Sequence, residues 1–429
     1  MIRFIYNLFW PLGLLIFLPG YCAKMIRRGG YREKFGQRVG IYDGEVRNRL
    51  SNQRPTWLHA VSVGEVNIAL KLANALRALE PELHCVLTTT TTTGFALARK
   101  TAPPWIEVMY TPLDYWPIMC RAFSVIRPAR IVLVEAEVWP NLAAAAHARR
   151  IPLALVNARL SPRSERRYRR FRFFVAPTFR LLDLVCVPER RDIERWAALG
   201  VPRNRMHVTG SIKFDPDVQA QSHTVAASVS HAFSPDSLVL FGGSTHRGEE
   251  EILVRVFLRL REQFPSLRLF IAPRHVERLQ EIRAHLGALP LRVTLASEAL
   301  TCGTADADCM LLDTTGELQR WYGIAAVVFI GKSLTAHGGQ NPVEPILAGK
   351  PVVFGPHMEN FATLAKTLVS NNAAMQVNDT DSLERTVGEL LRDSDARQRL
   401  VENAHAALNE HKGGTARTAK LVHELGPRH

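Results

Sequence analysis

From residue 55 onward the chain alternates short apolar runs with longer stretches of helical periodicity, in two successive series. Short apolar runs that end in polar or glycine-bearing loops are typical of buried parallel strands joined by helices, so we expect an α/β fold. The first series of expected strands is Trp57 to Val61, Cys85 to Thr89, Ile131 to Val134, Leu153 to Val156 and Leu184 to Val187. The second series is Leu238 to Gly242, Leu267 to Ile271, Leu291 to Leu295, Met310 to Leu312, Ala326 to Ile330 and Pro351 to Phe354.

Two series of strands predict two Rossmann-like domains facing each other across a cleft, and 429 residues is long for a single core. Residues 219–237 are rich in Ser, Ala and His without clear periodicity, which indicates a linker. The expected domains are therefore residues 24–218 and 238–429. Ligands of such sheets bind at the carboxyl ends of the strands, so the loops there hold the candidate functional residues.

The N-terminal segment predicts a membrane anchor over residues 1–23. Residues 4–23 carry no charge, and a bilayer is spanned by about 20 apolar residues in a helix. A cleaved signal peptide is the competing interpretation, but the apolar run is long for one and no clear small-residue cleavage site follows it. Basic residues after Ala23 favour a cytoplasmic location for the body of the protein. Whether the segment crosses the bilayer or only dips into it stays open.

The formal charge of +14 indicates an anionic partner, which could be nucleic acid, acidic lipid or a phosphorylated substrate. Arginine is dense between residues 159 and 172, where a plain solvated surface is the alternative. The six cysteines show no Cys-x-x-Cys pair and no Cys/His spacing for zinc, so we expect a reducing compartment and no metal.

Two motifs in the first half place carboxylates directly after expected strands. HAVSVGE (residues 59–65) puts Glu65 at a helix start, where it is either a base for an incoming hydroxyl or an ordinary first-turn glutamate. Ser62 does not form a nucleophile elbow, because Ala60 stands where the first glycine would be. EAEVWPN (residues 135–141) places Glu135 and a second acid directly after a buried-type strand. Buried carboxylates there reduce stability unless they are paired with other groups or have a function.

A lysine follows a glycine near the expected domain junction, in VTGSIKFD (residues 208–215). The Lys213 ammonium could neutralise a departing phosphate or an acidic sugar, or it could form a structural salt bridge with Asp215.

The second half carries the features of a nucleotide-sugar site. In GGQNPVEP (residues 338–345), two glycines allow close backbone approach, Pro342 suits a first helical position, and Glu344 could accept bonds from ribose hydroxyls. The alternative is that Asn341 caps the helix and Glu344 closes a capping box. Arg274 follows another strand, and its planar fork suits a phosphate.

Nine motifs together resemble the 3-deoxy-D-manno-octulosonic acid (Kdo) transferases of lipopolysaccharide synthesis, and the resemblance runs over nearly the whole chain. They are HAVSVGE, VEAEVWPN, NARLSPRS, VTGSIKFD, STHRGEE, APRH, DTTGEL, GKSL and GGQNPVEP. The resemblance implies an inverting GT-B glycosyltransferase that moves Kdo from CMP-Kdo to a lipid A precursor (lipid IVA) at anionic inner-membrane lipids. It also implies that the transfer needs no metal or other cofactor.

The resemblance also implies residue roles. Glu65 would be the general base, and Glu135 and Lys213 would stabilise the transition state. The residues implied for CMP are Pro273, Arg274, Thr315, Gly316, Glu317, Asn341, Pro342, Val343 and Glu344. Two positions depart from the family pattern: Gln340 stands where histidine is common, and Thr315 where methionine is often found, which puts fine donor contacts in doubt.

Two other functions compete with this interpretation. One is a GT-B transferase that uses another nucleotide sugar, such as a UDP-sugar, on a lipid-linked acceptor. The other is a membrane-tethered protein that binds nucleic acid, but the sequence has no helix-turn-helix, RNP or zinc-finger pattern. We therefore expect no nucleic-acid partner.

Overall fold

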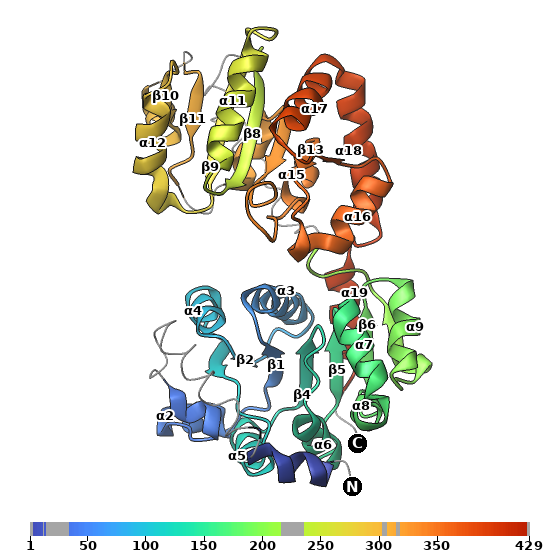
Figure 1. Ribbon diagram of the computed structural model, residues 1–429. Coiled ribbons are helices and arrows are strands. Elements are labelled where there is room, and N and C mark those ends of the chain that lie inside the picture. Colours follow the sequence, from blue (N-terminus) through green and yellow to red (C-terminus); the bar gives the residue numbers. More distant parts are fainter. Residues whose placement is uncertain are drawn as a thin grey trace. The chain divides into compact units, whose positions relative to one another are not determined.

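The computed structural model describes residues 3–11, 13, 34–215, 236–302, 307–314 and 318–426. These residues form two compact units (Figure 1). The first unit comprises Met1–Asp215 and His411–His429, and the second comprises Pro216–Glu410. Each unit is built on one parallel seven-stranded sheet, which confirms the expected α/β class with two Rossmann-like sheets.

The first sheet has the strand order β3-β2-β1-β4-β5-β6-β7. Its strands are β1 (Thr56–Ala60), β2 (Cys85–Thr89), β3 (Ile106–Tyr110), β4 (Arg130–Val134), β5 (Leu153–Val156), β6 (Leu184–Val187) and β7 (Met206–Val208). Its helices are α2 (Gly44–Ser51), α3 (Val63–Leu79), α4 (Thr92–Thr101), α5 (Trp116–Ile126), α6 (Pro140–Ala148), α7 (Pro162–Arg170), α8 (Arg172–Phe179), α9 (Arg190–Ala198) and α19 (Gly414–Glu424), with 3-10 turns at Phe35–Val39 and Arg203–Arg205.

Apolar side chains cover both faces of this sheet, as expected for strands that are buried throughout. One core cluster joins the sheet to α3 and α4, and the other joins it to α2, α5 and α6. Figure 1 shows α3 and α4 on one side of the sheet and α5 and α6 on the other. The strand order reverses between β1 and β4, and ligands of doubly wound sheets bind at such a point.

The structure differs from the predicted C-terminal domain of residues 238–429, because residues 411–429 belong to the first unit. Helix α19 packs against α3, and Ala419 and Val422 are buried in the same core cluster as α3. The Asp215 carboxylate accepts hydrogen bonds from the backbone N–H groups of Gly413 and Thr415, both at 2.7 Å. These bonds place Asp215 at the start of α19. The predicted linker, residues 219–237, lies almost entirely outside the described residues.

The second sheet has the strand order β10-β11-β9-β8-β12-β13-β14. Its strands are β8 (Leu238–Thr245), β9 (Leu267–Pro273), β10 (Val293–Leu295), β11 (Cys309–Leu311), β12 (Val327–Ile330), β13 (Val352–Phe354) and β14 (Met375–Gln376). Its helices are α11 (Glu249–Arg261), α12 (Leu279–Gly287), α13 (Ala296–Cys302), α14 (Leu318–Trp321), α15 (Val343–Leu347), α16 (Ala362–Ser370), α17 (Thr380–Arg392) and α18 (Ser394–Asn409), with 3-10 turns at Val276–Arg278, Tyr322–Ile324 and Glu359–Phe361. The strand order reverses between β8 and β12, so the loops after these two strands meet at one edge.

The predicted membrane anchor is described only in part. Residues 3–11 are helical, whereas residue 12 and residues 14–23 lie outside the described residues. Among the residues that the structure describes, no helix combines the length and the apolar character needed to cross a membrane. Asn7 and Asn141 join the described helix to α6 by a reciprocal pair of amide hydrogen bonds, at 2.8 and 3.0 Å.

Candidate active site

Glu65 is held at the start of α3 by the backbone that precedes it. The Ser62 hydroxyl donates to one carboxylate oxygen at 2.8 Å, and the Val61 N–H donates to the other at 2.8 Å. Ser62 also caps α3 by accepting a long bond from the Glu65 N–H at 3.4 Å. Ser62 therefore positions Glu65, which agrees with the expectation that it is no nucleophile.

Burial gives Glu65 an unusual acidity. Its exposed fraction is only 8%, and this desolvation raises the pKa of the carboxyl from 4.5 to about 7. The bonds from Val61 and Ser62 lower the pKa, and the charges of Glu135 and Glu137 raise it. A carboxylate with a pKa near neutrality can take a proton from a hydroxyl and later release it, as a general base must.

Glu135 follows β4 in a backbone conformation that ordinary side chains avoid. Its φ is 62°, in the left-handed region, and its N–H donates to the Val156 carbonyl oxygen at 2.9 Å. Such a conformation costs on the order of 1 kcal/mol or more, and strain of this kind clusters at functional sites. Burial raises the pKa of the neighbouring Glu137, and Glu135 adds to that rise. The two acids after β4 and Glu65 after β1 therefore interact electrostatically with one another, at the point where the strand order reverses.

Lys213 lies in the loop after β7 and interacts electrostatically with Glu135. Burial lowers the pKa of its ammonium, the Glu135 charge raises it, and the Arg159 charge lowers it. This loop is tied to the end of β5 by Asn157, whose side-chain oxygen accepts from the Ile212 N–H at 3.1 Å and from the Ser211 hydroxyl at 3.2 Å. The structure thus brings together all three predicted catalytic residues: Glu65 in the first turn of α3, after β1, and Glu135 and Lys213 in the loops after β4 and β7.

A buried histidine that the sequence analysis did not single out supports the loop of Glu135. His59 has no exposed surface, and its Nε2 accepts from the Trp139 indole N–H at 3.2 Å. An indole only donates, so the His59 proton is on Nδ1, which faces the Thr88 hydroxyl at 3.2 Å. Burial lowers the pKa of His59 to about 4, so the ring is neutral at physiological pH. The sequence signal was a histidine within an otherwise apolar strand.

In the second unit, Asn341 and Glu344 form a hydrogen-bonded pair. The Asn341 amide donates to the Glu344 carboxylate at 3.0 Å and accepts from the Val343 N–H at 3.1 Å. Burial raises the pKa of Glu344, whereas bonds from Asn341 and Gln319 and the charge of Arg274 lower it. The expected capping box is not formed, because Asn341 lies one residue before the N-cap position and Glu344 accepts from its side chain rather than from the N-cap backbone. Pro342 occupies the N-cap position, one residue before the first helical position that the sequence predicted for it, because α15 begins at Val343.

Arg274 lies at the end of β9, directly after Pro273, and its N–H donates to the Thr245 carbonyl oxygen at 3.0 Å. Since its charge lowers the pKa of Glu344, the structure brings the predicted phosphate and ribose residues into one electrostatic neighbourhood. Thr315, Gly316 and Glu317, which were also predicted to bind CMP, lie outside the described residues.

Glu249 shapes the loops of this unit and was not predicted. One carboxylate oxygen accepts from the N–H groups of His246 at 2.8 Å and Lys332 at 2.7 Å. The other accepts from those of Ser333 at 3.0 Å and Leu334 at 3.1 Å. Glu249 has no exposed surface, so these four bonds are what make its burial tolerable. The carboxylate locks together the loops that follow β8 and β12.

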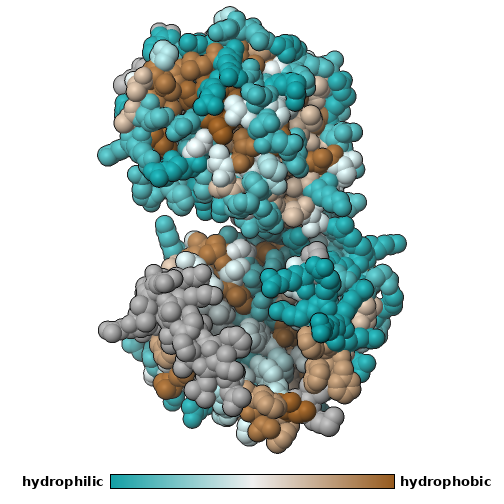
Figure 2. All heavy atoms as spheres, in the orientation of Figure 1, coloured by the Kyte–Doolittle hydropathy of each residue, from teal (hydrophilic) through white to brown (hydrophobic). Residues whose placement is uncertain are grey.

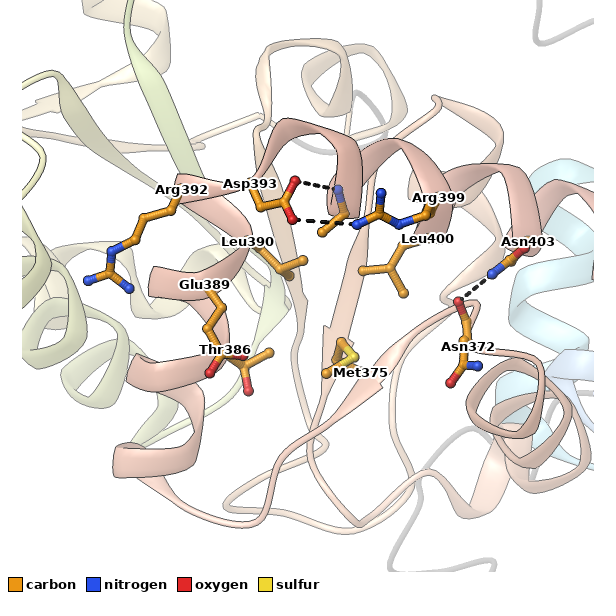
Figure 3. Close-up of a pocket in the computed structure, with 11 residues that line it drawn as sticks. Asn372, Met375, Thr386, Glu389, Leu390, Arg392, Asp393, Arg399, Leu400 and Asn403 are labelled. Atoms are coloured by element: carbon orange, nitrogen blue, oxygen red, sulfur yellow. Dashed lines mark hydrogen bonds and ion pairs between the residues drawn. The ribbon is translucent and has the colours of Figure 1, made fainter.

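An open pocket elsewhere in the second unit contains none of the predicted site residues. Its volume is about 620 Å³, and it lies among β14, α17 and α18 (Figure 3). Asp393 on its wall caps α18 through the Ala396 N–H and pairs with Arg399, while Asn403 donates to the Asn372 carbonyl oxygen. The polar groups drawn there mainly hold the ends of the helices in place.

Two surfaces of the first unit combine apolar side chains with polar or basic ones. The helix of residues 3–11 exposes Phe4, Leu8 and Phe9 while Asn7 faces α6. Helix α7 exposes a row of arginines, and α8 exposes aromatic side chains beside it. The exposed members are Arg163, Arg166, Arg167, Arg169, Arg170, Phe171, Arg172, Phe173 and Phe174. Figure 2 shows a hydrophilic region over α7 next to a more hydrophobic one over α8.

Comparisons with known proteins agree with the resemblance. A family model described as 3-deoxy-D-manno-octulosonic-acid transferase (kdotransferase) matches residues 33–216. The 3-deoxy-D-manno-octulosonic acid transferase of Haemophilus influenzae is 31% identical over 393 residues, which cover 91% of each chain. That of Bordetella pertussis is 33% identical over 383 residues, covering 86% of this chain and 87% of the relative.

Among solved structures, Anabaena Alr3699/HepE in complex with UDP matches 87% of this chain and all of its own, with a TM-score of 0.54 and 15% identity. The UDP-GlcNAc 2-epimerase of Neisseria meningitidis matches with a TM-score of 0.52 and 14% identity, covering 86% of this chain and 98% of its own. At these identities the two structures show a shared fold alone, which is GT-B-like. Because the two bacterial transferases align over most of the chain, this protein belongs to the family of 3-deoxy-D-manno-octulosonic acid (Kdo) transferases and is a glycosyltransferase.

Proposed function

We propose that this enzyme transfers Kdo from CMP-Kdo to the lipid A precursor lipid IVA and releases CMP. The observation that carries the proposal is Glu65, a buried carboxylate with a pKa near 7 where the strand order of the first sheet reverses. Family membership supplies the sugar, and the Asn341–Glu344 pair beside Arg274 suits a nucleoside monophosphate.

The chemistry is a single displacement at the anomeric carbon of Kdo. Glu65 takes the proton from an acceptor hydroxyl while the oxygen of that hydroxyl forms a bond to the anomeric carbon. The bond between that carbon and the CMP phosphate oxygen breaks, so the configuration inverts. Positive charge that develops on the sugar ring is stabilised by the Glu135 carboxylate. The Lys213 ammonium offsets the negative charge of the sugar acid or of the departing phosphate.

The donor residues belong to the second unit. Arg274 binds the phosphate as a planar donor of paired hydrogen bonds, and Glu344 accepts from the ribose hydroxyls. Pro273, Asn341, Pro342 and Val343 complete this donor set. The residues assigned by resemblance alone are Thr315, Gly316 and Glu317. The acceptor and the base accordingly belong to the first unit.

The transfer itself needs no metal ion under this proposal. A monophosphate leaves with less charge than a diphosphate, and the cations of Arg274 and Lys213 can offset it. At saturating CMP-Kdo, transfer by enzyme treated with a chelator should therefore continue at the untreated rate.

We infer that the enzyme acts at the cytoplasmic face of the inner membrane. The apolar face of helix 3–11 suits the interface of a bilayer, and the arginines of α7 beside the aromatics of α8 suit anionic headgroups. An acceptor held in the membrane by its acyl chains is accessible only to an enzyme at that surface.

Donor competition tests the nucleotide part of the proposal. CMP should displace a labelled cytidine nucleotide from the full-length enzyme at concentrations at least about tenfold below those needed for UMP or UDP, since pyrimidine recognition depends on specific hydrogen bonds. Equal competition by UDP would favour a transferase that uses a UDP-sugar. Retention of nucleic acid without any CMP binding would point to the other alternative.

A further inference from the structure

Three potential metal ligands converge beside the Gly338–Gly339 turn of the second unit, from two different loops. His337 precedes the turn, and His357 and Glu359 follow β13. One Glu359 oxygen lies 3.1 Å from the Nδ1 of His337 and 3.4 Å from the Nδ1 of His357. All three ligand groups offer atoms within 4.8 Å of one another.

The two nitrogen-to-oxygen separations are close to those of a tetrahedral zinc site. Zinc bonds of about 2.0–2.1 Å to nitrogen and oxygen place neighbouring ligand atoms about 3.3 Å apart in a tetrahedron. The two measured nitrogen-to-oxygen distances, 3.1 and 3.4 Å, lie on either side of that value. Two imidazoles and one carboxylate are also a common donor set for this class of ion, with water in the fourth position.

The surrounding backbone fixes two of the three ligands. The second Glu359 oxygen accepts from the Gly338 N–H at 2.6 Å, so the carboxylate is oriented with its first oxygen toward the histidines. The His357 N–H donates to the Ser333 carbonyl oxygen at 3.0 Å, and the Asn360 N–H donates to that of Gly338 at 2.9 Å. In metal proteins, hydrogen bonds to the metal-binding residues hold their side chains in position.

We propose that His337, His357 and Glu359 bind a divalent transition-metal ion of the zinc class, which clamps the loop of residues 331–341 to residues 356–360. Neutral imidazoles coordinate through Nδ1 after their proton shifts to Nε2, and the Glu359 carboxylate supplies the negative charge. Gly338 and Gly339 both have positive φ, at 121° and 68°, and they lie between His337 and the Asn341–Glu344 pair. The clamp therefore restrains the turn that leads into the proposed donor residues. This site is separate from the proposed base and is not required for the displacement.

Metal titration of the full-length protein tests the proposal without any measurement of turnover. After chelator treatment and desalting, Zn²⁺ is titrated in competition with a chromophoric chelator, and Co²⁺ is added separately as a spectroscopic probe. The wild type should bind one Zn²⁺ at this site and give the intense visible bands of four-coordinate Co²⁺. His337→Ala, His357→Ala and Glu359→Gln should each weaken that binding by at least about tenfold.

His285→Ala is the matched control, because His285 pairs with Glu251 at 3.5 Å on the same unit but belongs to no three-ligand group among the described residues. It should bind Zn²⁺ as the wild type does. His337 has a side chain that is 76% exposed, so its removal should leave the metal-free melting temperature unchanged and exclude misfolding as the cause. The proposal is overturned if His337→Ala and His357→Ala keep wild-type affinity, or if His285→Ala loses as much affinity as they do.

Discussion

Glu65 provides the sharpest prediction, because one burial effect controls both the rate and the stability. With a pKa of about 7, the Glu65 carboxylate is about one tenth ionised at pH 6 and about nine tenths ionised at pH 8. A base must be ionised, so kcat/KM for transfer should rise about ninefold between these pH values and level off above. Initial rates at acceptor concentrations well below KM, with product mass as readout, measure this profile.

Glu65→Gln removes the base while it preserves shape and volume. Loss of a general base costs on the order of 10²- to 10⁴-fold in rate, and the remaining activity should no longer depend on pH near 7. CMP affinity should stay near normal, since the donor residues belong to the other unit. Asp114 caps α6, and burial raises its pKa to about 6. Because Asp114 is the same in the wild type and in Glu65→Gln, any effect of its protonation on the rate should appear in both.

The same substitution should change stability, with a sign that depends on pH. The folded protein holds the Glu65 proton more tightly than the unfolded chain does, so stability falls as pH rises from about 4.5 to about 7. A shift of this size corresponds to about 3 kcal/mol, of which the lost bond from the Val61 N–H offsets about 1 kcal/mol. Glu65→Gln should therefore be more stable than the wild type by about 2 kcal/mol at pH 8 and nearly equal to it at pH 5.

Urea titrations of the wild type and Glu65→Gln at pH 5 and pH 8, monitored by a spectroscopic probe in the first unit, measure this difference in stability. Three results would refute the reasoning: a rate profile that is already flat at pH 6, turnover above a tenth of normal in Glu65→Gln, or a variant that is less stable than the wild type at pH 8.

Three further predictions concern the donor residues, the loop carboxylate and the membrane surface. Arg274→Ala should weaken CMP binding about 10- to 100-fold in a calorimetric titration, since a charge-assisted bond contributes about 1.5–3 kcal/mol, and an unchanged affinity would remove Arg274 from the phosphate site. Glu249→Gln should destabilise the second unit by about 3 kcal/mol or more in urea unfolding, because an amide cannot accept from all four N–H groups. Glu251→Gln, at an exposed position of the same helix, should change the free energy of unfolding by no more than about 0.5 kcal/mol. Equal effects of the two substitutions would contradict this role of Glu249. Serine at both Phe173 and Phe174 should reduce flotation with anionic vesicles, and Leu79→Ser, at an exposed position of α3, should not; the idea fails if both bind alike.

The sequence predicted most of the two sheets because most of their strands are buried and largely apolar. Three strands were missed, and each lacks that signal. β7 and β14 are edge strands of three and two residues with exposed side chains, and β3 carries a partly exposed glutamate, Glu107. Edge strands need fewer apolar residues because one side of them contacts solvent.

The assignment of α19 to the first unit could not be read from sequence order. Helix α19 follows the second unit directly along the chain, and nothing in its composition marks the return. Helix α19 is joined to the first unit by packing against α3, about 350 positions away in the sequence, and by two bonds to Asp215, about 200 positions away. Long-range contacts of this kind leave no local pattern.

The candidate site was predictable where a motif places a polar residue after a buried strand, as for Glu65, Glu135 and Arg274. It was not predictable where a residue acts through the backbone. Glu249 reads as one of three consecutive glutamates at a helix start, and only the fold shows that it accepts four N–H groups. The tautomer of His59 likewise depends on Trp139, which is 80 residues away in the sequence.

The most direct measurement is transfer from CMP-Kdo, generated in the assay, to tetraacylated lipid A precursor, with the product mass read directly for the wild type and Glu65→Gln. The account predicts that the wild-type enzyme adds the mass of one or more Kdo units, with release of CMP, and that Glu65→Gln adds almost none while it still binds CMP. A wild-type enzyme that binds CMP but leaves the acceptor mass unchanged would contradict the proposed donor and acceptor pair.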